Sequence, residues 1–228
     1  MREDWPLIAR YTEQFNSAPD NNLTGANTAA RTTSYAAVVD AARTIAAEYG
    51  ITAISATTAS TITLLTSLAG AVSAVEVGTG TGTATMALLA GMQGGGILTS
   101  VDSDADKQSI ARELLDVAGV KTHRVRMMTG RGEQVLGRLS RGGYNVVFLD
   151  AEPLTYEQLV PVALDRLAPG GLLIIHHALL GGAVANPANR DPRAAALRKI
   201  LATVSDYTHL QRLLLPIDQG LLVLRAQL

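Results

Sequence analysis

From Val72 onward, short runs of apolar, often β-branched residues alternate with longer segments whose apolar positions recur at helical spacing. Short apolar runs predict strands, and the longer periodic segments predict helices. The predicted strands are Ala74–Val77, Ile97–Val101, Thr122–Met127, Asn145–Leu149, Leu172–His176, Leu210–Leu215 and Leu221–Leu224. The predicted helices are Ala84–Met92, Ala105–Ala118, Gly132–Leu139, Thr155–Leu167 and Arg193–Val204. This alternation is typical of βαβ units, so we expect an α/β fold with a mostly parallel, seven-stranded sheet and helices on both faces.

The two ends of the chain depart from this alternation. The last two predicted strands flank Pro216–Gly220, a connection short enough for a hairpin that puts an antiparallel strand at the edge of the sheet. Before Val72 lie a short amphipathic segment, the polar stretch Asn16–Ser34 and a helical segment, Tyr35–Tyr49. The polar stretch is either a lid over a site or an ordinary surface loop. We therefore expect a helical extension with a lid-like loop over residues 1–50 and an α/β domain over 51–228.

Composition narrows the class of protein. With 228 residues, 47% of them hydrophobic, the chain can bury the core of one α/β domain. Its 19 basic and 20 acidic residues give a net charge of -1 and form no basic run, so we expect no nucleic-acid partner. There is no cysteine, no apolar run long enough for a membrane span and no apolar signal core at the start. These features predict a soluble, cytoplasmic protein without a membrane partner.

The most informative motif is Glu76-Val-Gly-Thr-Gly-Thr-Gly82, where an apolar strand runs into a glycine loop that opens a helix. Such a loop lets backbone approach a ligand at a helix N-terminus, and Asp102, at the end of the next strand, suits ribose hydroxyls. Thr83 stands where a dinucleotide-binding loop has its third glycine, and Glu76 would repel a pyrophosphate. The motif favours S-adenosylmethionine, which has no phosphate, although a tight strand–helix turn alone would also leave such a pattern.

Two further candidates stand at strand ends, where ligands gather in open parallel sheets. Asp150 follows a strand apolar enough to be buried on both faces, and the pair His176-His177 follows another. Because adjacent strand residues point to opposite faces, only one histidine is expected to face the cleft. A histidine there suits a general base, and Asp150 with the imidazoles would suit zinc or iron better than magnesium. A helix cap at Asp150 and ordinary strand-end imidazoles remain open.

Together these segments resemble class I S-adenosylmethionine-dependent methyltransferases, and among them the small O-methyltransferases related to catechol and caffeoyl-CoA O-methyltransferases. The resemblance runs from about residue 51 to 225. It is carried, in order, by Glu-Val-Gly-Thr-Gly-Thr-Gly (76–82), Thr-Ser-Val-Asp-Ser-Asp (99–104), Tyr-Asn-Val-Val-Phe-Leu-Asp-Ala-Glu (144–152), Leu-Ala-Pro-Gly-Gly-Leu-Leu-Ile-Ile (167–175) and Leu-Leu-Leu-Pro-Ile-Asp-Gln-Gly-Leu-Leu-Val-Leu-Arg (213–225).

The resemblance implies a Rossmann-like methyltransferase fold, a small hydroxylated acceptor and a homodimer. It also implies that Asp102 binds the cofactor's ribose, that Arg131 and Gly132 lie beside its adenine, and that Asp150 faces its methionine amino group and the acceptor. The full implied set of cofactor-binding residues is Ile54, Glu76, Gly78, Thr79, Gly80, Ala84, Asp102, Ser103, Arg131, Gly132, Asp150 and Glu152. Ala84 stands where the family usually has serine, so one side-chain hydrogen bond is absent there.

The sequence departs from this family at the catalytic and metal positions. Asp150-Ala-Glu152-Pro153 replaces the usual Asp-Ala-Asp-Lys, and His176-His177 replaces the Asp-Asn pair that helps to bind magnesium. We therefore expect O-methyl transfer that does not depend on magnesium, with His176 taking the acceptor's proton and Asp150 orienting the acceptor or the donor. A non-catalytic cofactor-binding protein of this fold, or an NAD(P)-linked oxidoreductase, are the alternatives.

Overall fold

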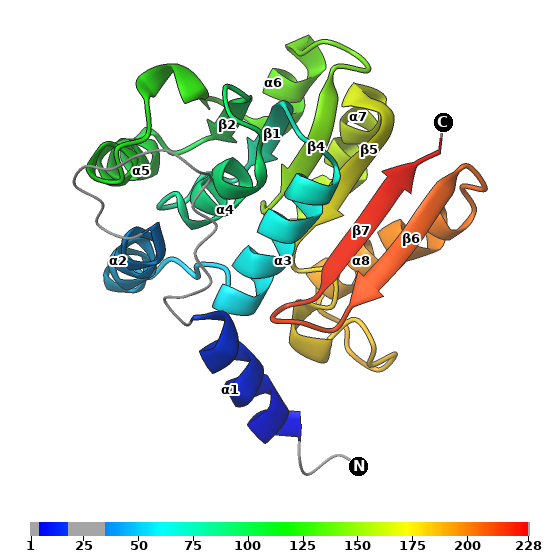
Figure 1. The fold of residues 1–228 in the computed structure, drawn as a ribbon. Helices are drawn as coiled ribbons and strands as arrows, with labels where there is room; N and C mark the ends of the chain where they lie inside the picture. The colour runs from blue at the N-terminus through cyan, green and yellow to red at the C-terminus, as the bar shows by residue number, and fades with distance from the viewer. Residues whose placement is uncertain (1–4, 18–34, 228) are drawn as a thin grey trace.

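The computed structural model describes residues 5–17 and 35–227, which contain eight α-helices and seven strands (Figure 1). The helices are α1 (Trp5–Asn16), α2 (Tyr35–Glu48), α3 (Ala56–Leu68), α4 (Thr83–Gly91), α5 (Ala105–Val117), α6 (Gly132–Arg138), α7 (Tyr156–Arg166) and α8 (Pro192–Ser205). The strands are β1 (Ser73–Val77), β2 (Ile97–Asp102), β3 (Val125–Thr129), β4 (Tyr144–Leu149), β5 (Leu167–Ile175), β6 (Leu210–Leu215) and β7 (Leu221–Ala226). Among the described residues, no helix is long and apolar enough to cross a bilayer.

The strands form one sheet in the order β3-β2-β1-β4-β5-β7-β6. β1 to β5 pair in parallel, and β7 pairs antiparallel with both β5 and β6. The predicted α/β class and C-terminal hairpin are therefore confirmed. Within the hairpin, β7 lies between β5 and β6, and β6 forms the edge of the sheet.

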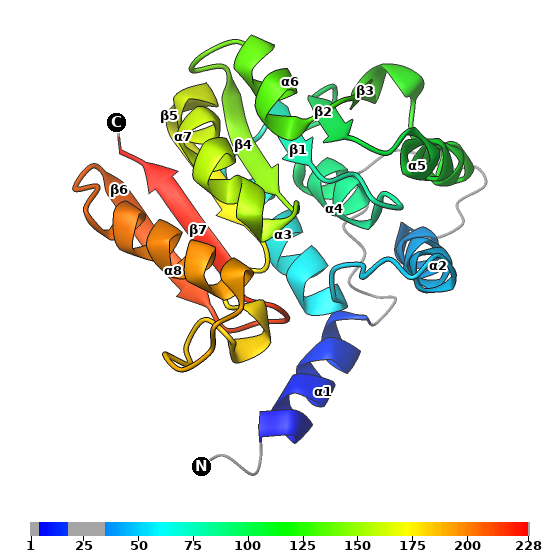
Figure 2. The same cartoon turned by 180° about the vertical axis from the view of Figure 1, so that it is seen from behind.

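The two faces of the sheet carry separate cores, because successive strand residues point in opposite directions. Val75 and Val147 belong to the core beneath α6, α7 and α8, whereas Ala74 and Phe148 belong to the core beneath α3 and α4. Figures 1 and 2, which view the molecule from opposite sides, show one set of helices on each face. This sandwich leaves the carboxyl ends of β1, β2, β4 and β5 together at one edge of the sheet.

The largest differences from the sequence prediction are the starts of two strands and one helix that was missed. Thr122–Arg124 form a 3-10 turn, so β3 starts only at Val125. β5 begins at Leu167 and passes through Pro169-Gly170-Gly171, so it starts five residues before the predicted strand Leu172–His176. Helix α3 was not predicted at all. The lid-like stretch lies outside the described residues apart from Asn16 and Ser17, and the domain boundary near residue 50 stays a prediction.

Candidate functional site

A cavity of about 810 Å³ opens at the carboxyl ends of the parallel strands. This volume lies within the range of pockets that hold cofactors and substrates. Its wall includes the loop after β1, the ends of β2 and β4, the start of α6 and residues 51–54 ahead of α3. The predicted cofactor residues that line it are Ile54, Gly78, Thr79, Gly80, Ala84, Asp102, Ser103, Arg131, Gly132, Asp150 and Glu152. The sequence thus identified residues that the fold brings together around one space.

The loop after β1 is held against the neighbouring strands by its backbone conformation. Gly78 has φ of 101°, and a Cβ there would lie 2.0 Å from the backbone oxygen of Asp150. The next glycine of the loop, Gly80, also has positive φ and donates its N–H to Asp102 Oδ2 at 3.0 Å. Asp102 Oδ1 accepts the N–H of Asp104 at 2.9 Å. Each oxygen of Asp102 therefore has one backbone donor and keeps acceptor capacity toward the cavity.

Glu76 lies below this loop and is fully buried, outside the cavity lining. Its Oε2 accepts hydrogen bonds from Thr85 at 2.6 Å and Ser100 at 2.7 Å, while Oε1 has no partner among the described residues. Burial raises the pKa of Glu76 to about 8, although the two hydroxyl donors partly oppose the rise. The structure therefore does not bring Glu76 to the cavity with the other predicted residues, and its cofactor role stays a prediction.

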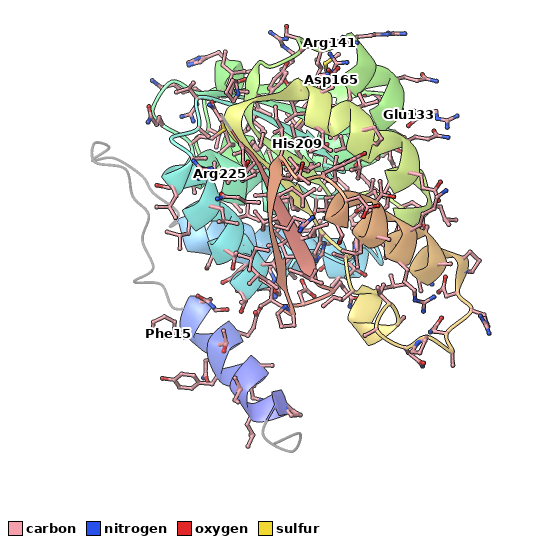
Figure 3. All side chains as sticks on the ribbon, turned by 90° about the vertical axis from the view of Figure 1, so that its right-hand side faces the viewer. Phe15, Glu133, Arg141, Asp165, His209 and Arg225 are labelled. Atoms are coloured by element: carbon pink, nitrogen blue, oxygen red, sulfur yellow. The ribbon has the colours of Figure 1, made fainter. Side chains whose placement is uncertain are left out.

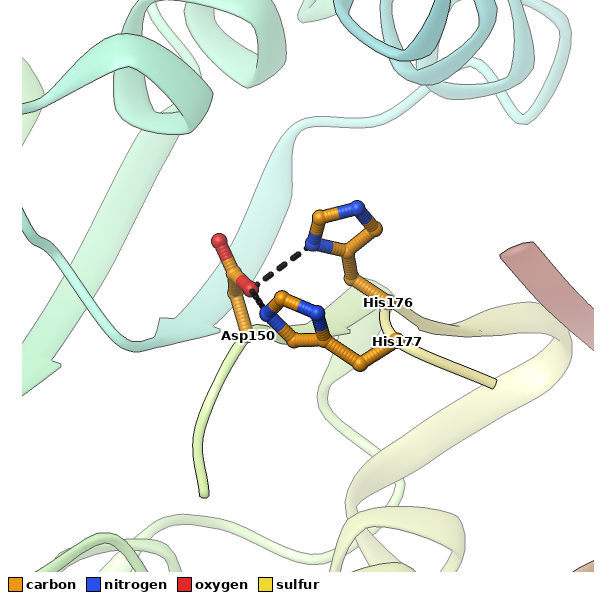
Figure 4. A group of neighbouring side chains, drawn as sticks. All are labelled: Asp150, His176 and His177. Atoms are coloured by element: carbon orange, nitrogen blue, oxygen red, sulfur yellow. Dashed lines mark hydrogen bonds and ion pairs between the residues drawn. The ribbon is translucent and has the colours of Figure 1, made fainter. Parts of the chain in front are cut away.

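A second network of side chains lies at the end of β4, next to the cavity (Figure 4). Asp150 Oδ1 lies 2.9 Å from Nδ1 of His176 and 3.0 Å from Nε2 of His177. Both rings reach the same carboxylate because His177 has φ of 61°, which breaks the alternation that an extended strand would impose. Only His177 lines the cavity, in line with the expectation of one histidine at the cleft, but the contact of both rings with Asp150 was not predicted.

Asp218 completes the network from the β6–β7 turn. Its Oδ2 lies 3.4 Å from Nε2 of His176, within ion-pair range but without hydrogen-bond geometry, and accepts the N–H of Ser55 at 2.9 Å. The position of Asp218 follows from a signal in the sequence. A hairpin whose second strand runs antiparallel beside β5 must turn at the carboxyl end of β5, which is where Asp218 lies.

The charges of this network follow from its contacts. Burial disfavours a charged imidazole, but Asp150 and Asp218 outweigh that effect and raise the pKa of His176 to about 9. Burial also opposes ionisation of Asp150, yet the two histidines hold the pKa of its carboxyl well below the usual range. At neutral pH the structure thus holds a buried imidazolium against an ionised carboxylate.

Comparison with known proteins bears on what this arrangement does. The sequence model of a family described as "O-methyltransferase" matches residues 32–227. The chain belongs to the O-methyltransferase family. A Mycolicibacterium vanbaalenii protein named "Putative O-methyltransferase" is 37% identical over 186 residues, 82% of each chain. As a member of this family, the chain can be compared with solved structures of related proteins.

Two of the solved structures align with almost the whole of this chain. A Corynebacterium glutamicum protein is 26% identical with a TM-score of 0.84, over 99% of this chain and 98% of that one. A Bacillus cereus O-methyltransferase, solved in complex with SAH, has a TM-score of 0.78 over 100% of both chains. At 19% identity the second likeness shows the fold alone. The Rossmann-like methyltransferase fold expected from the sequence is confirmed.

The residues of this protein do not fit the magnesium ion that the family resemblance implies. Asp150, His176 and His177 bring one ligand atom each to within 4.8 Å of one another, but two of the three are imidazole nitrogens. Magnesium prefers oxygen ligands in octahedral geometry, and by donor type the set would suit zinc or iron better. His176 also has a carboxylate beside each of its ring nitrogens. We therefore derive no chemistry through magnesium.

Proposed function

We propose that this chain transfers a methyl group from S-adenosylmethionine to a hydroxyl of a small molecule, without magnesium. The observation that carries the proposal is the single cavity that joins the glycine loop and Asp102 to the Asp150–His177 pair. A nucleoside cofactor at the first end would bring its reactive group toward an acceptor at the second. The methyltransferase structures solved with SAH or SAM, from Bacillus cereus and Streptomyces achromogenes, support the choice of cofactor.

The charges around the cavity support a cofactor without phosphate groups. Three cations line the cavity, and each has an acidic partner: Lys107 with Asp104, Arg131 with Glu133 and Arg193 with Asp191. The wall also carries the carboxylates of Asp102, Asp150 and Glu152. Among the described residues, this mixed, partly acidic wall has no unpaired cation that would stabilise a pyrophosphate. A sulfonium and an ammonium group would instead be favoured beside ionised carboxylates.

In such a transfer, some residues of the site would bind the cofactor and others would orient the reacting groups. When bound, S-adenosylmethionine supplies a methyl group on a positively charged sulfur. Asp102 would hold the ribose hydroxyls, and the backbone of Gly78 and Gly80 would lie close to the rest of the cofactor. Asp150, ionised at neutral pH, would orient the cofactor's ammonium group or the acceptor. In-line positioning and removal of the acceptor's proton are then sufficient for methyl transfer.

Calorimetric titration with S-adenosylmethionine tests the proposal directly. We expect binding that is the same with magnesium and with a chelator. We also expect Asp102→Asn to weaken binding by roughly 10- to 100-fold, since hydrogen bonds to a charged group contribute about 1.5–3 kcal/mol. Asp104→Asn is the matched control, because asparagine also caps helices well and Asp104 caps α5 outside the cavity.

The outcomes of this titration separate the alternatives. Binding of NAD in place of S-adenosylmethionine would replace the methyltransferase with an oxidoreductase. Cofactor binding without transfer of labelled methyl to any member of a panel of phenols and catechols would favour a non-catalytic protein. Equal affinity of the Asp102→Asn variant and the wild type would contradict the placement of the ribose.

We also propose that the protein is a homodimer formed through α1. This helix projects from the body (Figure 3) and exposes Leu7, Ile8, Tyr11 and Phe15, with Tyr11 71% exposed. It is anchored to α3, because Glu13 accepts hydrogen bonds from the N–H groups of Ala56 and Thr57. Apolar residues of this size on an anchored helix are typical of a protein interface.

Sedimentation of the wild type and a Leu7→Glu, Tyr11→Glu variant tests the dimer. We expect a wild-type mass near twice that of the 23.9 kDa chain and a monomeric variant with unchanged circular dichroism. The introduced carboxylates would repel one another across the interface, and they would lose their hydration when buried there. A wild type that sediments as a monomer at micromolar concentration would contradict the proposal.

A further inference from the structure

The two consecutive histidines after β5 have different surroundings, although both contact Asp150. The side chain of His176 is 1% exposed, and a carboxylate lies beside each of its ring nitrogens. The side chain of His177 is 22% exposed and lines the cavity. Only His177 is therefore open to a molecule in the cavity.

The contacts of His177 leave one ring nitrogen for that molecule. Its Nε2 lies 3.0 Å from Asp150 Oδ1. Within the described parts of the chain, its Nδ1 has no hydrogen-bond partner, and because Nδ1 is not one of the buried polar atoms that lack a partner, it is accessible. If an ionised carboxylate accepts the proton on Nε2, the neutral ring carries its lone pair on Nδ1. This is the state that a proton acceptor requires.

We propose that His177 removes the proton from the acceptor hydroxyl, with its ring held by Asp150 and, behind Asp150, by His176 and Asp218. The inference rests on the proposed methyl transfer and assigns one step of it. A bond forms between the acceptor oxygen and the methyl carbon, while the bond from that carbon to sulfur breaks and leaves its electron pair on sulfur. The hydroxyl proton passes to Nδ1 of His177, which becomes an imidazolium and later releases the proton to water. Asp150, His176 and Asp218 are positioning residues in this step.

Backbone conformation supports a special role for this cluster. Across the described residues, three non-glycine residues have positive φ: His177, Leu180 and Asp218. All three lie in the segment after β5 or in the β6–β7 turn that packs against it, where Ala178 and Leu179 donate to the backbone oxygens of Gly220 and Gln219. Such conformations cost energy and persist where the surrounding structure holds them, often at functional sites. Here the strain at His177 is what turns its ring toward Asp150.

The charges that face His177 are compatible with the role. They come from Asp150 just after β4, from the tilted ring of His176, whose centroid is 4.1 Å away, and from Asp218 at the β6–β7 turn. The positive charge on His176 offsets the negative charge on Asp150. His176 itself has no access to the cavity, so the earlier prediction that it takes the proton would need the network to open.

Variants at position 177 test the proposal on an acceptor that the wild type methylates. We expect His177→Gly to lower kcat by at least about 100-fold while the affinity for S-adenosylmethionine changes less than about twofold. Glycine suits the positive φ, so the variant should fold, and added imidazole should restore part of kcat. His177→Gln should be equally slow but should not respond to imidazole. His209→Gln, an exposed histidine outside the cavity lining (Figure 3), is the matched control.

Nitrogen NMR of the histidine rings gives a readout that needs no acceptor. Between pH 6 and 8 we expect both nitrogens of His176 to carry protons and the neutral ring of His177 to carry its proton on Nε2. A neutral ring of His177 that carries its proton on Nδ1 instead of Nε2 would overturn the inference. So would full turnover by His177→Gly, or wild-type turnover that a chelator abolishes and zinc restores. Loss of cofactor binding by the wild type would instead mean that the proposed function is wrong.

Discussion

Gly78→Ala is expected to lower the free energy of unfolding by about 2–6 kcal/mol and to abolish cofactor binding. Two costs add at this position. A Cβ would lie 2.0 Å from the backbone oxygen of Asp150, and backbone cannot move aside as a flexible side chain could. The residue also has φ of 101°, outside the regions that alanine readily adopts. Overpacking costs about 1–3 kcal/mol and a strained backbone of this kind about 1–3 kcal/mol more.

Two other glycines separate these costs in urea unfolding. Gly80 has φ of 50°, but its nearest neighbour to an added Cβ is a side-chain carbon of Ile51 at 3.9 Å. Gly80→Ala should therefore show the backbone cost alone, about 1–2 kcal/mol. Gly94 has neither a positive φ nor an atom within 4 Å, so Gly94→Ala should change stability by less than about 0.5 kcal/mol. If Gly78→Ala and Gly80→Ala lost equal stability, the close approach of the loop to Asp150 would be wrong.

The sequence predicted the sheet well because each central strand is buried on both faces. Runs such as Val146–Leu149 are apolar at every position and end in residues that turn or bind, so their limits are visible without any partner. The glycine loop was predictable for a related reason, since its conformation requires residues that side-chain packing alone would not select.

Helix α3 was missed because its polar groups are threonine hydroxyls that bond within the helix. Thr61 donates to the backbone oxygen of Thr57, and Thr63 donates to that of Ala59. With its hydroxyl satisfied, Thr63 can be buried beside Ile62, and the buried Thr58 hydroxyl contacts Ser55 and Asp218 instead of the helix backbone. The segment therefore shows no clean division into apolar and polar faces, and its threonines would equally suit a strand.

The sequence predicted those site residues that the order of the strands alone brings together. It missed the contacts that depend on local backbone geometry. Asp102 and Asp150 end parallel strands, so their meeting at one edge follows from the topology. The contact of both histidines with Asp150 depends on the backbone conformation of His177, which no pattern in the sequence reveals. Strand alternation turns the side chain of Glu76 away from the cavity and toward the face covered by α4, where it meets Thr85.

Burial of Glu76 should make the stability of the protein fall as pH rises from about 5 to 8. In the folded protein the pKa of this carboxyl is raised to about 8, whereas in the unfolded chain it has its ordinary value of 4.5. Between these values the folded state binds one more proton than the unfolded state, and stability is lost as pH rises. At about 1.4 kcal/mol for each pKa unit, the loss from this one group is on the order of 4–5 kcal/mol.

Glu76→Gln should flatten that dependence, because glutamine keeps the shape of the neutral carboxyl and has no proton to lose. The measurement is urea unfolding of the wild type and the variant at intervals from pH 5 to pH 9. His176, whose pKa is raised to about 9, lowers stability from about pH 6.5 upward in both proteins, so it cancels in their difference. The lowered pKa of Asp150 acts only below about pH 4, outside the range.

The exposed Glu113→Gln is the matched control and should follow the wild type at every pH. If Glu76→Gln also ran parallel to the wild type, Glu76 would have to be ionised in the folded protein at neutral pH. A buried charge of that kind would need a cationic partner. The structure provides only the hydroxyls of Thr85 and Ser100 as donors among the described residues. The slope of stability against pH therefore distinguishes a neutral carboxyl that supports the glycine loop from a charged one that awaits a ligand.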